Sequence, residues 1–190
     1  MTDAAVLLPD PSPQLEAGYR AAHARMQGLP FVNAALRVEA VAFAPWQDRW
    51  LGVLVTPWCM NLVLAPRDGR AWKPLAQGVE GRYEFPAGSY VFIGAHDPLA
   101  GAHQICSLFS PMLQFDDHDT ARLVATLARE ALFDAANAAV HTVPTGAPAP
   151  APVAAEPGPI AQLQENLEAP LSKRDFLRAR FLGGDRGDRG

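Results

Sequence analysis

Histidine and cysteine are the residues of this chain best suited to hold a metal ion, and their spacing does not fit that role. The 190 residues include five histidines and two cysteines. His103 and Cys106 form a loose pair, but residues three apart on a strand point to opposite faces. We therefore predict no resident metal and no cofactor.

Carboxylate groups occur in two small clusters, and neither has the setting of a catalytic acid–base pair. Glu80 and Glu84 flank a predicted strand and are typical of a solvated sheet edge. Asp116, Asp117 and Asp119 precede an apolar stripe, where negative charge stabilises the start of a helix. The sequence contains no Gly-x-Ser-x-Gly motif, phosphate-binding loop or dinucleotide fingerprint. We therefore expect a protein that binds a partner and is not an enzyme.

Tryptophan offers a different kind of chemistry, which is the recognition of a partner. Trp46 lies in a predicted turn, Trp58 at a corner and Trp72 just after a polar loop. Large aromatic side chains on loops often anchor bound peptides, although packing in the core or at its rim would explain them equally well. For Trp50, inside an apolar strand, packing in the core or at its rim is favoured over partner binding. Trp46, Trp58 and Trp72 are therefore candidate partner-binding residues.

The charge and the first residues narrow the class of partner and the compartment. The net charge of −4 argues against nucleic acid as the main partner, because phosphate binding needs a basic surface. The first lysine or arginine is Arg20, so the positive start of a secretory signal is missing. Cys59 and Cys106 stand in apolar contexts and are expected to be buried free thiols, as in a reducing compartment. The sequence thus predicts a cytoplasmic protein.

Residues 50–66 form the stretch around which we expect the chain to fold. They carry no charge, and they contain Thr56, Pro57 and Asn61 near their middle. The stretch is shorter than the ~20 apolar residues of a membrane-spanning helix. Proline lacks an amide hydrogen and pushes the preceding residue toward extended angles. Two buried strands joined by a corner at residues 56–58 are therefore favoured, without membrane insertion.

The predicted elements run helix, strands, helix, which indicates an α+β fold with an antiparallel sheet. The first helix is expected at about residues 13–27, and the second begins at the acidic cluster and carries an apolar stripe over residues 123–132. Both helices are expected to pack on one face of the sheet. Strands are predicted at residues 38–44, 50–56, 60–65, 83–85, 89–93 and 103–110.

The composition divides the chain into four parts. Residues 1–12 are expected to be a flexible arm and residues 13–141 the α+β domain. Residues 142–159 are rich in alanine and proline, which predicts a flexible linker without a core. Residues 160–190 are expected to be a tail with a short basic amphipathic helix.

Several short motifs, taken in order, resemble one protein family. Thr-Pro-Trp at residues 56–58 is followed by Asn-Leu-Val-Leu-Ala-Pro at 61–66 and Trp-Lys-Pro-Leu at 72–75. Phe-Pro-Ala-Gly-Ser-Tyr-Val-Phe at 85–92 and Cys-Ser-Leu-Phe-Ser-Pro-Met at 106–112 complete the set. Over about residues 12–140 the chain is similar to the HybE/HupJ/HoxT-type assembly chaperones of [NiFe]-hydrogenases.

The resemblance implies a cytoplasmic, non-enzymatic accessory protein for a membrane-bound hydrogenase. Its implied partners are the small-subunit precursor, or the twin-arginine signal peptide of that precursor, and other maturation chaperones. A twin-arginine peptide carries two guanidinium groups and an apolar stretch, so its receptor needs carboxylates beside an apolar groove. Glu80, Glu84 and Asp97 therefore join the three tryptophans as candidate partner-binding residues.

An alternative function is that of a redox or iron–sulfur handling factor of hydrogenase maturation. It would use Cys59 and Cys106 as ligands. Two thiolates are too few for an iron–sulfur cluster, which usually takes four. This alternative therefore requires a dimer or a shared site.

The tail contains a second resemblance. Residues 172–178, Ser-Lys-Arg-Asp-Phe-Leu-Arg, are similar to the twin-arginine export motif Ser-Arg-Arg-x-Phe-Leu-Lys. Ser172 and Asp175 also have the spacing of a capping box, which predicts a short helix that ends at Gly183. Two hypotheses stay open: a chance match in a basic tail, or an internal mimic of the client's signal peptide. The residues of the mimic would be Ser172, Lys173, Arg174, Phe176, Leu177 and Arg178.

Overall fold

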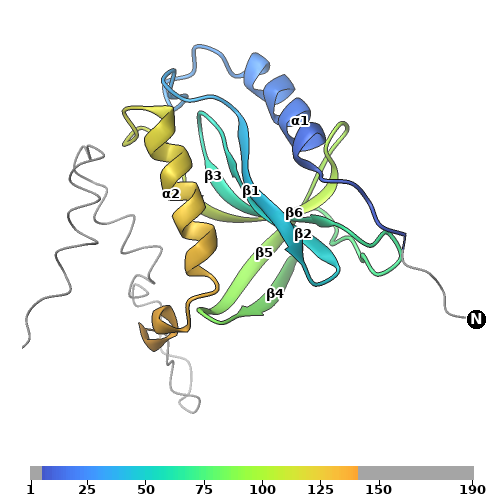
Figure 1. Ribbon diagram of the computed structural model, residues 1–190. Helices are drawn as coiled ribbons and strands as arrows, with labels where there is room; N and C mark the ends of the chain where they lie inside the picture. The colour runs from blue at the N-terminus through green and yellow to red at the C-terminus, as the bar shows by residue number, and fades with distance from the viewer. Residues whose placement is uncertain (1–5, 141–190) are drawn as a thin grey trace, which may run out of the picture.

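The computed structural model describes residues 6–140, which fold into an antiparallel six-stranded sheet with two α-helices (Figure 1). The elements are α1 (Ser12–Arg25), β1 (Glu39–Trp46), β2 (Arg49–Val55), β3 (Met60–Pro66), β4 (Glu80–Phe85), β5 (Gly88–Asp97), β6 (Gly101–Phe109), α2 (His118–Ala131) and the 3-10 helix η1 (Ala135–Val140). The spatial order is β1-β2-β3-β6-β5-β4. The predicted α+β class is confirmed. The predicted linker at 142–159 and the tail at 160–190 lie outside the described residues.

β2 and β3 are the two strands predicted from the uncharged stretch, and they lie at the centre of the sheet. Residues 51–55 of β2 and 60–65 of β3 are all buried. The Thr56 hydroxyl fixes the corner between them, because it accepts a hydrogen bond from the Cys59 amide at 2.9 Å and donates one to the Cys59 carbonyl at 2.8 Å. Within residues 6–140 no helix has the length and apolar character needed to cross a membrane.

The two faces of the sheet are covered by different helices, so the prediction that both helices pack on one face is wrong. On β2, Val53 belongs to the core that includes Val124 of α2, whereas Leu54 belongs to the core that includes Leu15 of α1. Figure 1 shows the two helices on opposite sides of β1 to β3. The reason is that a strand with apolar residues at every position buries side chains on both faces, and each face needs its own cover.

The sheet curves strongly enough for its two outermost strands to approach each other on the α2 side. Trp46 at the end of β1 stacks on Phe85 at the end of β4, with ring centroids 4.4 Å apart. The guanidinium of Arg49 lies over the ring of Tyr83, 4.9 Å from its centroid. We therefore call the α2 side the concave face, which holds the larger core, and the α1 side the convex face.

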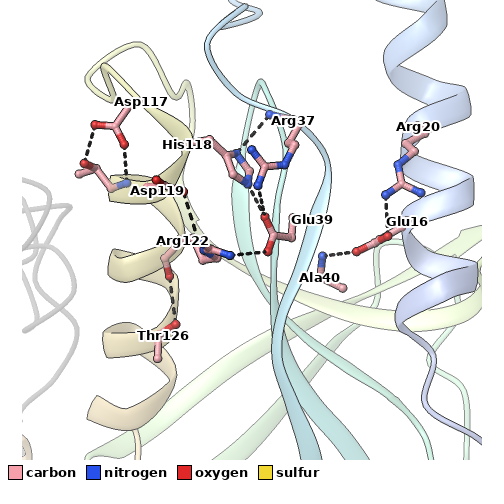
Figure 2. A network of polar contacts seen from close by, with 11 residues as sticks. Glu16, Arg20, Arg37, Glu39, Ala40, Asp117, His118, Asp119, Arg122 and Thr126 are labelled. Atoms are coloured by element: carbon pink, nitrogen blue, oxygen red, sulfur yellow. Dashed lines mark hydrogen bonds and ion pairs between the residues drawn. The ribbon is translucent and has the colours of Figure 1, made fainter.

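The start of α2 is fixed by the acidic cluster, as predicted, and is tied to β1 (Figure 2). Asp117 caps the helix by accepting a hydrogen bond from the Thr120 amide at 2.8 Å. Next to it, His118 lies 2.5 Å from a carboxylate oxygen of Glu39 on β1. Arg122, one turn later, forms an ion pair with the same carboxylate at 3.6 Å. Glu39 therefore holds the first turn of α2 against the edge of the sheet.

A second carboxylate attaches α1 to the same strand. Glu16 accepts a hydrogen bond from the backbone amide of Ala40 at 2.9 Å and pairs with Arg20 at 2.6 Å (Figure 2). Since β1 is an outermost strand, Glu16 satisfies a backbone donor that the strand would otherwise offer to another strand. β1 is thus held by both helices.

Residues 6–8, before α1, lie against the turn that follows β3. The Leu8 amide donates to the Arg67 carbonyl at 2.7 Å, and the Gly69 amide donates to the Val6 carbonyl at 3.0 Å. The indole nitrogen of Trp50 donates to the Leu8 carbonyl at 3.3 Å. Trp50 is only partly buried, so it packs at the rim of the sheet and not in the core. The cause is that it covers this N-terminal segment at the end of β2.

Candidate functional site

The six candidate partner-binding residues are divided between the two faces of the sheet. Trp46 and Trp72 pack against the concave core. The alternation of side chains along each strand and the packing against α1 place four of them on the convex side: Trp58, Glu80, Glu84 and Asp97. The structure therefore does not bring the six residues together into one site.

The two tryptophans of the concave face serve the core. Trp46 stacks on Phe85 and meets the edge of Tyr83, so it joins β1 to β4. Trp72 packs on the same core, and its indole nitrogen is buried without a hydrogen-bond partner among the described residues. Neither ring is placed to touch a partner on the convex face.

Trp58 occupies the corner between β2 and β3, beside α1. Its ring stacks on Tyr19, with centroids 6.4 Å apart and planes 11° from parallel. The His23 ring lies 5.9 Å from it. Trp58 stays partly exposed. It is the candidate tryptophan that lies on the same face as the candidate carboxylates.

A tyrosine–histidine pair, which the sequence analysis did not single out, attaches α1 to β6. The Tyr19 hydroxyl lies 3.0 Å from Nε2 of His103, and Nδ1 of His103 lies 2.9 Å from the Gly101 carbonyl. A carbonyl can only accept, so Nδ1 carries the proton and Nε2 accepts from Tyr19. Burial lowers the pKa of His103 and raises the pKa of Tyr19. The pair is therefore neutral at pH 7 and holds the helix in place.

Asp97 lies close to α1, and its carboxylate is engaged in the turn between β5 and β6. It accepts hydrogen bonds from the amides of Ala100 at 2.9 Å and Leu99 at 2.8 Å. The hydrogen bond from Ala100 is the main cause that lowers the pKa of Asp97. Asp97 is therefore charged at neutral pH, and its oxygen Oδ1 already has partners within the chain.

Replacement of Gly18 tests this close approach of α1 to the turn. A Cβ atom at position 18 would lie 2.3 Å from Oδ1 of Asp97. Alanine in a helix gains about 1 kcal/mol over glycine, whereas overpacking costs about 1–3 kcal/mol. We expect Gly18→Ala to lower the free energy of unfolding in urea by about 1 kcal/mol. A variant more stable than the wild type would contradict the close approach of α1 to Asp97, because the gain in helix propensity would then exceed the cost of overpacking.

The part of the convex face formed by β4 and by residues 91–93 of β5 lies beyond the residues that pack beneath α1, and we call it the open face. Its residues are Glu80, Arg82 and Glu84 of β4 and Val91 and Ile93 of β5. It borders Ile105 of β6, which pairs with Ile93 and packs against the core beneath α1. Ile93 is 41% exposed although it lies inside a strand. Glu80 is directly opposite Ile93, and Arg82 is opposite Val91. Apolar strand positions are therefore flanked by charged ones.

The side chains at the hairpin end of the open face are connected. Ser89 donates to the Glu84 carboxylate at 2.7 Å, and Arg82 donates to the Ser89 hydroxyl at 3.1 Å. The two glutamates were predicted from the sequence, whereas Arg82, Val91 and Ile93 were not. The signal for them was the alternation of charged residues at 80, 82 and 84 with apolar residues at 91 and 93.

The two cysteines lie on opposite faces of the sheet. Sγ of Cys59 is 3.3 Å from the Thr56 hydroxyl and 3.4 Å from the Asn61 amide, on the convex side. Cys106 packs against the concave core. Burial raises the pKa of Cys59 and raises the pKa of Cys106 to about 11. Both thiols are free and stay protonated at neutral pH, which makes them poor metal ligands and nucleophiles.

The positions of the two cysteines argue against an iron–sulfur cluster held within one chain. Two thiols on opposite faces of one sheet cannot ligate the same cluster within one chain. Within the range 6–140, no group of three or more histidine, cysteine, aspartate or glutamate side chains could hold a metal ion.

Comparison with known proteins identifies the family. The family described as "[NiFe]-hydrogenase assembly, chaperone, HybE" matches residues 10–179, which is most of the chain. The chain belongs to the HybE family. The resemblance found in the sequence motifs is thereby confirmed.

Relatives of the chain carry hydrogenase-related names. A hydrogenase expression/formation protein HupJ from Bradyrhizobium diazoefficiens is 39% identical over 153 residues, which cover 80% of this chain and 78% of the relative. Protein HoxT from Cupriavidus necator is 42% identical over 113 residues, 54% of this chain and 63% of the relative. A "probable rubredoxin HupJ" from Rhodobacter capsulatus is 41% identical over 117 residues, and the chain spans only 42% of its length.

A solved structure shares the fold. The solution structure of HybE from Escherichia coli aligns with a TM-score of 0.56 and covers 82% of this chain and 94% of that one. The identity is 20%, so this comparison establishes the HybE-like α+β fold alone.

Proposed function

We propose that this HybE-family chain is an assembly chaperone that binds the small-subunit precursor of a membrane-bound [NiFe]-hydrogenase, at its twin-arginine signal peptide. It retains the precursor in the cytoplasm until maturation is complete, and it has no catalytic activity of its own. Other maturation chaperones are further candidate partners. Among the described residues, those of the open face give this proposal its main support.

The chemistry of the open face supports a cationic and apolar ligand. Glu80 and Glu84 are exposed on one edge of the face, and the partly exposed Ile93 lies opposite Glu80. Hydrogen bonds between guanidinium and carboxylate groups are about twice as strong as neutral ones. An apolar side chain that follows the arginines would cover Ile93 and Val91. These are the two kinds of contact that a twin-arginine peptide offers.

The iron–sulfur alternative has less support. Cys59 and Cys106 lie on opposite faces, so a cluster would have to take its ligands from two chains. An iron-handling protein would show visible absorbance that is lost in a Cys106→Ala variant. Purified wild-type protein that is colourless yet captures the precursor would favour the chaperone.

Charge reversal of the open face tests the proposal. We expect Glu80→Arg with Glu84→Arg to weaken capture of the small-subunit precursor at least about tenfold, because two attractive charges become repulsive. The matched control is Glu130→Arg with Asp134→Arg, which makes the same change of charge at exposed positions at the end of α2 and beyond it. Pull-down with a tagged precursor measures both. Equal capture by the two double variants would show that the open face is not the binding site.

A further inference from the structure

Within residues 6–140 the outer edge of β4 is not paired with another strand, and the side chains that approach β4 from β1 and β2, Trp46 and Arg49, contact Phe85 and Tyr83 on its concave side. β4 is the last strand in the sheet order, and within the described part of the chain no strand pairs with its outer side. Phe85 is opposite Gly88 at the two-residue turn, and the Gly94 amide donates to the Val79 carbonyl at 2.8 Å beyond the other end of the strand. Closely paired residues alternate along an antiparallel pair. The amide and carbonyl groups of Glu80, Arg82 and Glu84 therefore point to the open edge.

The opposite edge of the sheet is not equivalent. On β1, Glu16 takes the Ala40 amide. The pairing with β2 also shifts register between Val41 and Ala44, where Ala42 has a φ of 53°. An irregular, capped edge is a poor template for another strand. β4 is regular over its whole length and is the better of the two edges for an added strand.

The charges on β4 select what can pair with it. Along its open face, Glu80, Arg82 and Glu84 alternate negative, positive and negative. A second copy of β4 laid antiparallel across Arg82 would put each glutamate opposite a glutamate and Arg82 opposite itself, and like charges directly opposite destabilise a pair. The complementary strand has cations at alternate positions with an uncharged residue between them.

The tail of this chain has a sequence with this pattern. Arg174, Phe176 and Arg178 give a cation, an aromatic ring and a cation at alternate positions. In antiparallel register Arg174 would face Glu84, Phe176 would face Arg82 and Arg178 would face Glu80. The middle pair is also favourable, because a guanidinium group is attracted to the face of an aromatic ring.

We propose that residues 172–178 bind the outer edge of β4 as an added antiparallel strand, with Arg174 opposite Glu84 and Arg178 opposite Glu80. The export motif Ser-Arg-Arg-x-Phe-Leu-Lys has its cation, phenylalanine and cation at the same alternate positions. The client's signal peptide therefore displaces the tail from this edge. This displacement rests on the proposed function, whereas the pairing of the tail with β4 does not.

The chain is long enough for this contact. η1 packs against β5, the neighbour of β4, and ends at Val140. Residues 141–171 then provide 31 residues of connection, for which a flexible chain has a root-mean-square span of about 30 Å. The predicted local helix is no obstacle, because a helix this short is marginal in water. A tethered segment within reach competes at an effective concentration on the order of millimolar.

Amide hydrogen exchange in the full chain tests the pairing. We expect the outward amides of β4, at positions 80, 82 and 84, to be protected in the wild type. Arg174→Glu with Arg178→Glu should speed their exchange by about tenfold. Combining this pair with Glu80→Arg and Glu84→Arg should restore the protection, because every pair is then complementary again. The inward amide of Tyr83 should stay protected in all variants and reports that the sheet is intact.

The matched control for the tail is Arg186→Glu with Arg189→Glu, which makes the same charge change beyond the motif. It should leave the outward amides protected. If these amides exchange equally fast in the wild type and in the Arg174→Glu, Arg178→Glu variant, the tail does not pair with β4 and the proposal is overturned.

A second measurement separates this inference from the proposed function. A synthetic peptide with the sequence Ser-Arg-Arg-Ala-Phe-Leu-Lys is titrated into each full-length variant. The Arg174→Glu, Arg178→Glu variant, which loses the tail contact, should bind this peptide about tenfold more tightly than the wild type. The control variant, Arg186→Glu with Arg189→Glu, should bind the peptide as the wild type does. Equal affinity for all tail variants would overturn the competition. No binding to any variant, together with the expected amide protection, would overturn the proposed function and leave the tail contact established.

Discussion

Replacing Leu64 with alanine is expected to lower the free energy of unfolding by about 2–5 kcal/mol. Leu64 is fully buried on β3, in the concave core. β2 pairs with it on one side through Leu51 and β6 on the other through Gln104. Central strands bonded on both sides cannot move in to fill a cavity, so the cost should lie in the upper part of this range.

Leu54→Ala provides the comparison from the convex face. Leu54 is also fully buried, but it belongs to the smaller core beneath α1. A helix can shift toward a cavity more easily than a paired strand, so we expect a smaller loss within the same range. Urea unfolding of both variants measures the difference. Val79→Ala is the control, since Val79 is 48% exposed and should change stability by less than about 0.5 kcal/mol. If Leu64→Ala also lowered the free energy of unfolding by less than about 0.5 kcal/mol, Leu64 could not lie at the centre of the concave core.

Raising the pH from about 9 to about 11 is expected to remove stability through Cys106. Burial raises the pKa of this thiol from 9.0 to about 11 in the folded protein. Below the unfolded pKa, the thiol is protonated in both states and its contribution is fully present. As the pH rises toward the folded pKa, the unfolded chain loses this proton first, which favours unfolding. The loss is on the order of 2 kcal/mol.

The Cys106→Ala variant isolates this effect. Cys59 has a raised pKa as well, but it is present in both proteins and its pKa does not depend on Cys106, so its contribution cancels in the difference. The pKa of Tyr90 is raised mainly by burial and secondly by the charge on Cys106, so this second part is included in the effect that the variant removes. Urea unfolding at pH 8, 9, 10 and 11 should give a steeper fall for the wild type than for the variant. Parallel curves would mean that the Cys106 thiol is not shielded by the concave core.

The central strands could be predicted because their signal is local. An uncharged run rich in valine and leucine and broken by Pro57 fits little other than two buried strands. The positions of the helices could not be predicted in the same way. α1 buries only Leu15 and Gly18, so its sequence has no broad apolar stripe that would show which face it covers.

The residues of the candidate site were likewise predictable where the signal is local and not where it depends on the fold. Glu80 and Glu84 were found because alternation along one strand places them on one face. The role of Trp46 depends on curvature that brings β1 to β4, a contact between residues 39 positions apart, 46 and 85, that no local pattern encodes. The exposure of Ile93 likewise depends on where α1 ends over the sheet.

The order of the strands has a consequence for how fast this protein folds. Four of the five strand pairs join neighbours in sequence, and β3 with β6 is the exception. The chain can therefore form β1 to β3 and β4 to β6 as local units within its fastest steps. Joining them brings residues 60–64 to residues 104–109, which requires closure of a long loop before any contact compensates for the lost entropy. We therefore expect that junction to set the height of the kinetic barrier. Substitutions along it should slow folding, whereas substitutions at the outer hairpins should mainly speed unfolding.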